Sequence, residues 1–153
     1  MEVPETFHTY SFGWYRFEVS SRAPYEVYHG LRQLCRKVNA LQFVCLKFLN
    51  KQLIWYLPLM QNYFKRPNHP RTRPMMRVAN DVLEQIRGDD GLVKRTENLI
   101  EEIVRENPLL RRYTIEYMNI LVRPLYDLNA KLRDLYSHIE YMIRPVEIAI
   151  DLT

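Results

Sequence analysis

Histidine, cysteine and carboxylate residues are the side chains of this chain with the chemistry for acid–base, nucleophilic or metal-dependent catalysis. Two Glu-x-x-His words occur, from Glu5 to His8 and from Glu26 to His29. Di-iron helical bundles use such words because residues i and i+3 lie on one helix face and can hold one metal. Here the first word lies beside Pro4 and the second at an expected helix start. A small helical metal-dependent enzyme is therefore only a second alternative, and we predict no metal and no cofactor.

The two cysteines, Cys35 and Cys45, lie ten residues apart within one expected helix. Ten helical residues span about 15 Å, which is beyond the reach of a disulfide, and two thiols are too few for a structural zinc site. Cys45 falls on an apolar stripe, where burial raises the pKa of a thiol and makes it a poor nucleophile. The sequence also contains no HExxH, GxSxG, P-loop or CxxC motif. We predict that the chain is not an enzyme and has no small-molecule substrate.

A basic, proline-rich stretch at about residues 62–74 is the sharpest local feature. Five cations lie within 13 residues and no acid stands among them: Lys65, Arg66, Arg71, Arg73 and Arg77. Cationic side chains neutralise phosphates, and the neighbouring Tyr63 and Phe64 have rings that stack on unpaired bases. The alternative function is therefore a nucleic-acid-associated helical protein. A docking loop for an acidic protein, a lipid contact and a solvated loop remain open beside it.

The net charge of +4 is unevenly distributed along the chain. Residues 1–77 hold 12 Lys and Arg and 4 Glu, for a net charge of +8, whereas residues 78–153 have a net charge of −4. This distribution indicates either an acidic partner for the first half or attraction between the two halves in one fold.

The elements that position these residues are mainly helices. From Pro24 onward, apolar residues recur at alternating spacings of four and three, which predicts a long helix over about residues 24–57. We expect Pro58 to kink or end it. Gln52 is the single polar residue of this first apolar seam, and it either sets register and partner choice or lies where the helix frays. The seam residues expected to bind a partner are Leu31, Leu34, Val38, Leu41, Phe48 and Trp55.

A second apolar seam runs through the last third of the chain at the same spacing. It follows two shorter helical patterns separated by the Gly88–Gly91 turn signal, so several returning helices are expected over about residues 75–150. Helices are expected to start or bend at Pro124 and Pro145. The residues of this seam expected to bind a partner are Leu125, Leu128, Leu132, Leu135, Ile139 and Met142.

Residues 1–22 differ from the rest because they are aromatic and lack a helical period. We predict an extended N-terminal arm that contacts a partner through Tyr10, Phe12 and Trp14, and a single helical domain over residues 23–153. The expected fold class is all-α: an elongated helical bundle, or a coiled-coil-like hairpin of one long helix and several shorter returning helices.

Length and composition limit the function classes. The chain has 153 residues, of which 47% are hydrophobic and 26% charged, so a single folded domain is expected and disorder is excluded. Lys47 and Lys51 interrupt the most apolar stretch, so no transmembrane segment is predicted and a membrane-surface role is disfavoured. The acidic N-terminus and unpaired thiols indicate an intracellular location, cytoplasmic or nuclear. We predict a non-enzymatic protein–protein interaction module, a scaffold or adaptor subunit that pairs with itself or with a partner chain.

Overall fold

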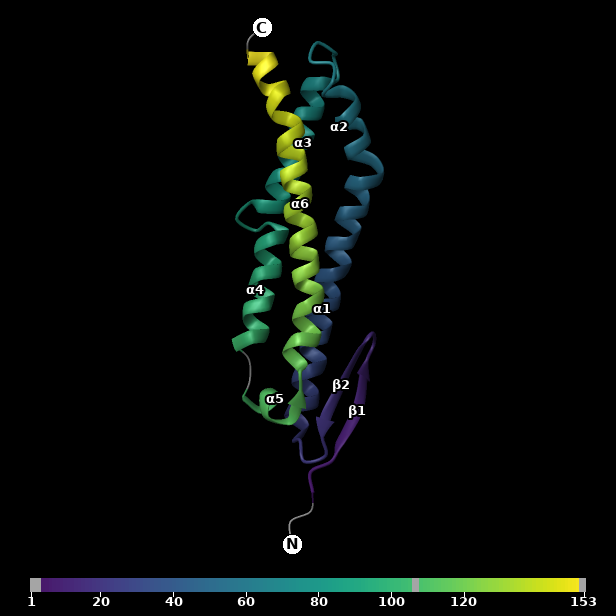
Figure 1. Ribbon diagram of the computed structural model, residues 1–153, viewed down its shortest axis with the longest axis vertical. Helices are drawn as coiled ribbons and strands as arrows, with labels where there is room; N and C mark the ends of the chain where they lie inside the picture. The colour runs from purple at the N-terminus through teal and green to yellow at the C-terminus, as the bar shows by residue number, and fades with distance from the viewer. Residues whose placement is uncertain (1–3, 106–107, 152–153) are drawn as a thin grey trace.

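The computed structural model describes residues 4–105 and 108–151, and the chain is elongated and mostly helical (Figure 1). Two long helical segments run side by side along most of the molecule, and shorter helices cover one side of them. A small antiparallel sheet lies at the end of the molecule where the described chain begins. The mostly helical bundle was predicted correctly, but the purely all-α class is wrong because of this sheet.

The first long segment is continuous from Tyr25 to Tyr63. It consists of α1 (Tyr25–Lys51), the π-helix η1 (Gln52–Tyr56) and α2 (Leu57–Tyr63). The expected end near Pro58 is absent, because the wider π turn precedes the proline and its ring is accommodated. In this turn the N–H of Leu57 donates to the carbonyl of Gln52, five residues earlier. The helix therefore continues to Tyr63, and Gln52 does not lie at a frayed end.

The connector after Tyr63 is an ordered series of turns. The hydroxyl of Thr72 donates toward the carbonyls of Tyr63 (3.0 Å) and Arg66 (2.6 Å), which ties both ends of the connector together. Pro74 falls in the first turn of the next helix, where a missing N–H costs little. The helix therefore begins at Thr72, slightly before the expected position.

The returning helices are α3 (Thr72–Arg87), α4 (Leu92–Arg105), α5 (Pro108–Tyr113) and α6 (Tyr117–Asp151). The predicted turn after α3 is present, and within it the N–H of Gly91 donates to the carbonyl of Gly88 at 2.9 Å. α6 is a single helix that passes through Pro124 and Pro145, so no helix starts at either proline.

The expected arm is a β-hairpin. β1 (Phe7–Phe12) and β2 (Tyr15–Ser20) pair antiparallel, and β2 also pairs with the two-residue strand β3 (Thr114–Ile115). The hairpin turn requires Gly13, whose φ of +66° is unfavourable for residues with a side chain. Alternate residues of β2 point into the core, which joins the hairpin to the helical domain.

The core extends along the contact between the two long helices and the shorter ones. Its largest fully buried side chains include Phe17, Leu31, Met60, Ile86, Ile103, Leu110, Tyr117, Leu121, Leu125, Leu132 and Ile139. These residues come from both apolar seams, from β2 and from the shorter helices, so a single core holds the hairpin and the bundle together.

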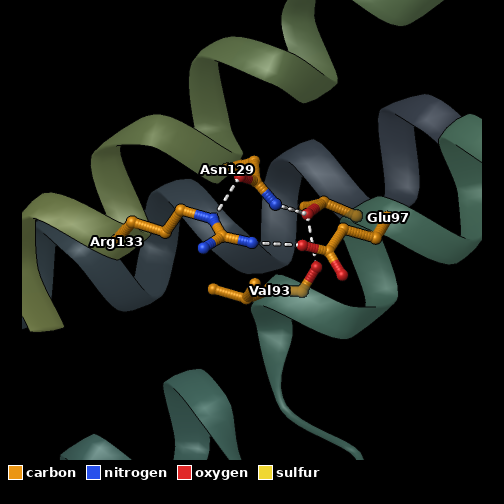
Figure 2. A network of polar contacts seen from close by, with 5 residues as sticks. Val93, Glu97, Asn129 and Arg133 are labelled. Carbon is orange, nitrogen blue, oxygen red and sulfur yellow. Dashed lines mark hydrogen bonds and ion pairs between the residues drawn. The ribbon is translucent and has the colours of Figure 1, made fainter.

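A polar network fixes α4 against α6 (Figure 2). The hydroxyl of buried Thr96 donates to the carbonyl of Val93 at 2.7 Å and accepts a hydrogen bond from the side-chain amide of Asn129 at 2.9 Å. Arg133 then donates through Nε to Asn129 at 2.8 Å and through Nη2 to the carboxylate of Glu97. The buried hydroxyl is therefore satisfied, and the contact between the two helices has one defined register.

Candidate protein-interaction surface

The second half of the first helical segment exposes two groups of large apolar side chains, separated by exposed Lys47, Asn50 and Lys51, and together we call them the apolar band. Its members are Phe43, Val44, Leu46, Leu53, Ile54, Trp55 and Leu59. Phe43, Ile54 and Trp55 are each more than 60% exposed. The band therefore lies on α1, η1 and α2, along the outer face of a helix whose opposite face is in the core.

The apolar band is large for a surface that faces water. A large apolar side chain offers about 150–250 Å², so these partly exposed side chains leave on the order of 700 Å² open to solvent. The largest apolar patch on a typical monomer is about 300–600 Å². Each partner of a standard protein–protein interface buries about 800 Å². The summed exposed area of these side chains is thus close to what one side of such an interface requires.

A groove borders the band where α1 and η1 face α3, and we call it the Gln52 groove. It has a volume of about 480 Å³. Its apolar walls are formed by Phe43, Val44, Phe48, Tyr56, Val78 and Val82. Its polar residues are Lys47, Lys51, Gln52, Asp81 and Gln85. Phe43 and Val44 belong to both features, so the groove and the band form one surface.

Gln52 is the unusual residue of this groove. Its side chain is only 3% exposed, and its Oε1 accepts no hydrogen bond from the residues that the structure describes. A buried carbonyl oxygen without a donor destabilises the fold, because it has lost its hydrogen bonds to water and gained none. Gln52 also begins the π-helix, a feature frequently found at functional sites.

A second groove borders the opposite edge of the band, between the first helical segment and α6. Its volume is about 450 Å³. Its apolar lining consists of Leu46, Leu49, Leu53, Leu57 and Leu135. Two members of the apolar band, Leu46 and Leu53, thus form one wall of this groove.

The structure places most of the predicted seam residues inside the chain's own core. Those that are buried are Leu31, Leu34, Val38, Leu41, Leu125, Leu128, Leu132, Leu135 and Ile139. Phe48 and Met142 are half-buried, and Trp55 is exposed. Among the predicted seam residues, Trp55 is therefore the one that offers most of its side chain to another molecule.

Of the predicted arm residues, Tyr10 and Phe12 lie on the inner face of the hairpin, opposite Phe17 and Tyr15 of β2, and Trp14 lies at its tip. Tyr10 packs against Tyr28 of α1 with ring centroids 4.8 Å apart, and Phe12 is half-buried against Phe17. Trp14, at the hairpin turn, is 93% exposed. The buried residues of the hairpin are those of β2, and Trp14 is the most exposed of the three predicted arm residues.

The five predicted cations of the basic connector are all exposed, and none forms an ion pair within the described residues: Lys65, Arg66, Arg71, Arg73 and Arg77. Arg71 donates a hydrogen bond to the hydroxyl of Tyr63 at 3.3 Å. Tyr63 packs against His69 with ring centroids 4.9 Å apart, and Phe64 is buried. The cations are thus open to an anion, whereas the ring of Phe64 is not available for stacking.

The candidate catalytic residues are not brought together in a site. Across residues 4–105 and 108–151, no group of three or more His, Cys, Asp or Glu side chains is placed to hold a metal ion. Burial raises the pKa of the Cys35 thiol to about 12 and that of the Cys45 thiol to about 11, the nearby Arg95 partly offsetting the effect at Cys45. Both thiols are therefore protonated near neutral pH and resemble small apolar side chains.

Most of the apolar band lies off the heptad seam that the sequence predicts. Phe43, Leu46 and Ile54 fall outside the strict heptad spacing, so they received no role. The sequence does contain a signal for these exposed residues. A helix with apolar residues both on and off its seam cannot bury all of them against one side of a bundle.

Comparisons of this chain with protein-family models, with curated proteins and with solved structures find no match. Within the described part of the chain, none of the helices combines the length and the apolar character that crossing a membrane requires.

Proposed function

We propose that this chain is a non-enzymatic protein–protein interaction module, a scaffold or adaptor subunit, and that it pairs through the apolar band. The observation that carries the proposal is the exposed area of the band, on the order of 700 Å², on one continuous helix. Trp55 lies within the band, and tryptophan is enriched among the residues that dominate binding energy at interfaces.

We propose a second copy of this chain as the partner. The area of the band supports this choice, because a symmetric pair covers the same apolar surface on both copies. The Gln52 groove also supports it: Lys47 and Asp81 both line the groove, and neither forms an ion pair within the described residues. In a symmetric pair, Lys47 of each copy faces Asp81 of the other, so the same ion pair forms twice.

The experiment is sedimentation velocity of the purified chain over a concentration series, together with the variants Leu53→Glu and Ile54→Glu. The wild type is expected to change from a species of 18.6 kDa to one of twice that mass. Both variants are expected to remain monomeric, because each places a charge inside the contact. Tyr126→Glu is the matched control, since Tyr126 is also exposed but lies on α6, outside the band.

Urea unfolding distinguishes loss of pairing from loss of folding. Leu53 and Ile54 are exposed, so their substitution is expected to change the free energy of unfolding of the monomer by no more than about 0.5 kcal/mol. A wild-type chain that remains monomeric at every concentration contradicts self-pairing. Variants that pair as well as the wild type contradict the assignment of the band.

The second candidate function is binding of nucleic acid through the basic connector. It is favoured by the five exposed cations without an ion-pair partner in the described chain. Since Phe64 is buried, we expect contacts to phosphates and little sequence preference.

Its test is the salt dependence of the affinity for a single-stranded oligonucleotide. The affinity is expected to fall steeply with salt and to be lost when the five cations are replaced by Gln. Equal affinity of the parent and the five-Gln variant excludes this function.

A further inference from the structure

We propose that the open edge of β1 binds an extended acidic segment of a partner protein. The segment adds to the sheet as a further strand and places two carboxylates against Arg32 and Arg36 of α1. This interface is separate from the apolar band, so the inference goes beyond the proposed function and does not depend on self-pairing.

The first observation is that one edge of β1 has no partner. β1 lies on the outer side of the hairpin (Figure 1) and pairs with β2 alone among the described strands. Phe12 and Tyr15 flank the two-residue turn, so they form a hydrogen-bonded pair, and hydrogen-bonded pairs then alternate along the strand. The N–H and C=O groups of Phe7, Thr9 and Ser11 therefore point away from β2. No backbone hydrogen bond reaches them within the described residues.

The sequence of β1 does not protect this edge. Edge strands of natural sheets commonly carry a charged residue, a proline or a bulge that prevents pairing with another chain. The strand Phe7–Phe12 contains no Lys, Arg, Asp, Glu or Pro, and its register with β2 runs without a bulge. The edge is thus free to accept the backbone of another extended segment, which is how proteins bind peptides by strand addition.

The second observation is the position of β1 along α1. The ring of Tyr10 packs against that of Tyr28 with centroids 4.8 Å apart, and at the hairpin turn Gly13 lies beside the side chain of Asn39. β2 lies nearer to the core, because its alternate side chains are buried. β1 therefore follows α1 over these two turns of contact, with its open edge directed away from the core.

The helical period gives the residues of α1 that lie beyond this edge. Successive helix residues are rotated by about 100°. The core residues Leu31 and Leu34 are thus rotated from Tyr28 by about 60° and 120° in one direction. Arg32 and Arg36 are rotated from it by about 40° and 80° in the other direction. A strand added to the outer edge of β1 therefore lies over these two arginines.

The charges of this surface indicate what the added strand carries. Arg32 and Arg36 are exposed, and neither forms an ion pair or a cation–π contact in the described part of the chain. They are separated by about 6 Å along the helix, close to the roughly 6.8 Å between alternate residues of a strand. Residues opposite Tyr10 and Phe12 face α1, since Tyr10 does. Acidic side chains at these two alternate positions therefore meet the two arginines.

A second copy of β1 does not supply these carboxylates. Antiparallel pairing of two β1 strands, symmetric about Thr9, places His8 opposite Tyr10 and Thr6 opposite Phe12. Neither His8 nor Thr6 is acidic. The occupant that fits the charge is thus a different chain, in agreement with the net charge of +8 over residues 1–77.

The test of the charge is fluorescence anisotropy of the full chain with a labelled peptide in which glutamate and valine alternate. The double variant Arg32→Glu/Arg36→Glu is expected to bind it at least about tenfold more weakly, because like charges then face each other. Lys65→Glu/Arg66→Glu is the matched control, since it changes the net charge equally at the opposite end of the molecule, and its affinity is expected to equal that of the wild type. Equal affinity of the wild type and the α1 variant overturns the proposal, as does absence of binding to the wild type.

The test of strand addition uses the backbone. Ser11→Pro removes an outward N–H and leaves the hydrogen bonds to β2 intact, which is where a strand tolerates proline. It is expected to abolish peptide binding. The same peptide with alternate backbone nitrogens methylated keeps its charges and is expected not to bind the wild type. Tight binding of the methylated peptide overturns strand addition, whatever the stability of the Ser11→Pro variant.

Sedimentation velocity of the Ile54→Glu variant tests the other occupant. This variant is expected to remain monomeric, because the apolar band is its proposed self-pairing surface. A dimer of Ile54→Glu that is lost when Ser11→Pro is added identifies a second copy on β1 and overturns the acidic partner. Peptide binding by a chain that never dimerises supports this inference and contradicts only the proposed self-pairing.

Discussion

Replacing Gln52 by Leu is expected to make the monomer more stable. Gln52 is buried with an unpartnered Oε1, so in the unpaired chain the amide contributes a desolvation cost that no hydrogen bond offsets. Leucine has a similar helix propensity and brings no polar atom into the core. A residue that lowers the stability of the isolated chain is expected where the surface is completed by another molecule.

The magnitude follows from the burial of the amide. An unsatisfied buried polar group costs about 1–3 kcal/mol. Leucine is slightly bulkier than glutamine and branches at Cγ, so its repacking in the core takes back part of this gain. We therefore expect the free energy of unfolding to rise by about 1–2 kcal/mol, which for a chain of this length raises Tm by about 3–6 °C.

The assay is urea unfolding at a concentration where sedimentation finds only monomer, with wild type and Gln52→Leu measured side by side. Equal m-values are required, so that the difference reflects the folded state. Thr114→Val is the comparison, because it removes the other buried polar atom without a partner in the described chain. A loss of stability in Gln52→Leu refutes the reasoning, since it means that Oε1 accepts a hydrogen bond in the folded monomer.

Two further predictions concern the core. Because burial raises the pKa of Cys35 to about 12 and of Cys45 to about 11, the unfolded chain loses its thiol protons first, so stability is full below pH 9 and falls as the pH rises toward 11. Urea unfolding at about pH 8 and about pH 10 should show a smaller fall in the free energy of unfolding for the double variant Cys35→Ala/Cys45→Ala than for the wild type. An equal fall in both proteins contradicts the assignment of this pH dependence to the two thiols. Asn129→Leu, which removes the bonds to Thr96 and Arg133, is expected to lower the free energy of unfolding by about 1–2 kcal/mol at constant m-value; no change would mean that the network does not hold α4 on α6.

The helical seams were predictable because their periodicity is itself a consequence of burial. Leu31 and Val38 recur at the spacing that places them on one helix face, and the structure buries both. The same pattern correctly predicts the second seam through Leu132 and Ile139. The helical periodicity of the sequence thus predicts both long helices and most of the core.

The sheet and the π-helix were not predictable in the same way. β3 is two residues long, Thr114 and Ile115, which is too short for any period, and its pairing with β2 depends on the tertiary fold. The general rule for proline predicts that Pro58 interrupts the helix. A local change to i→i−5 hydrogen bonding removes the clash that this rule assumes, and the helix continues.

The candidate surface was predictable only in part. The heptad spacing predicts Trp55 as a contact residue and marks Gln52 as the polar exception in the seam. The burial of Gln52 without a hydrogen-bond partner for its Oε1 depends on tertiary packing, which the sequence pattern does not reveal. Most other seam residues pack inside the chain, because a heptad pattern does not distinguish a contact with another helix of the same chain from a contact with a second chain.

Sedimentation velocity of the wild-type chain over a wide concentration range tests the central claim most directly. The account predicts a reversible change from 18.6 kDa to twice that mass, and its loss in Ile54→Glu but not in Tyr126→Glu. A chain that sediments as a compact monomer of 18.6 kDa at every concentration contradicts it.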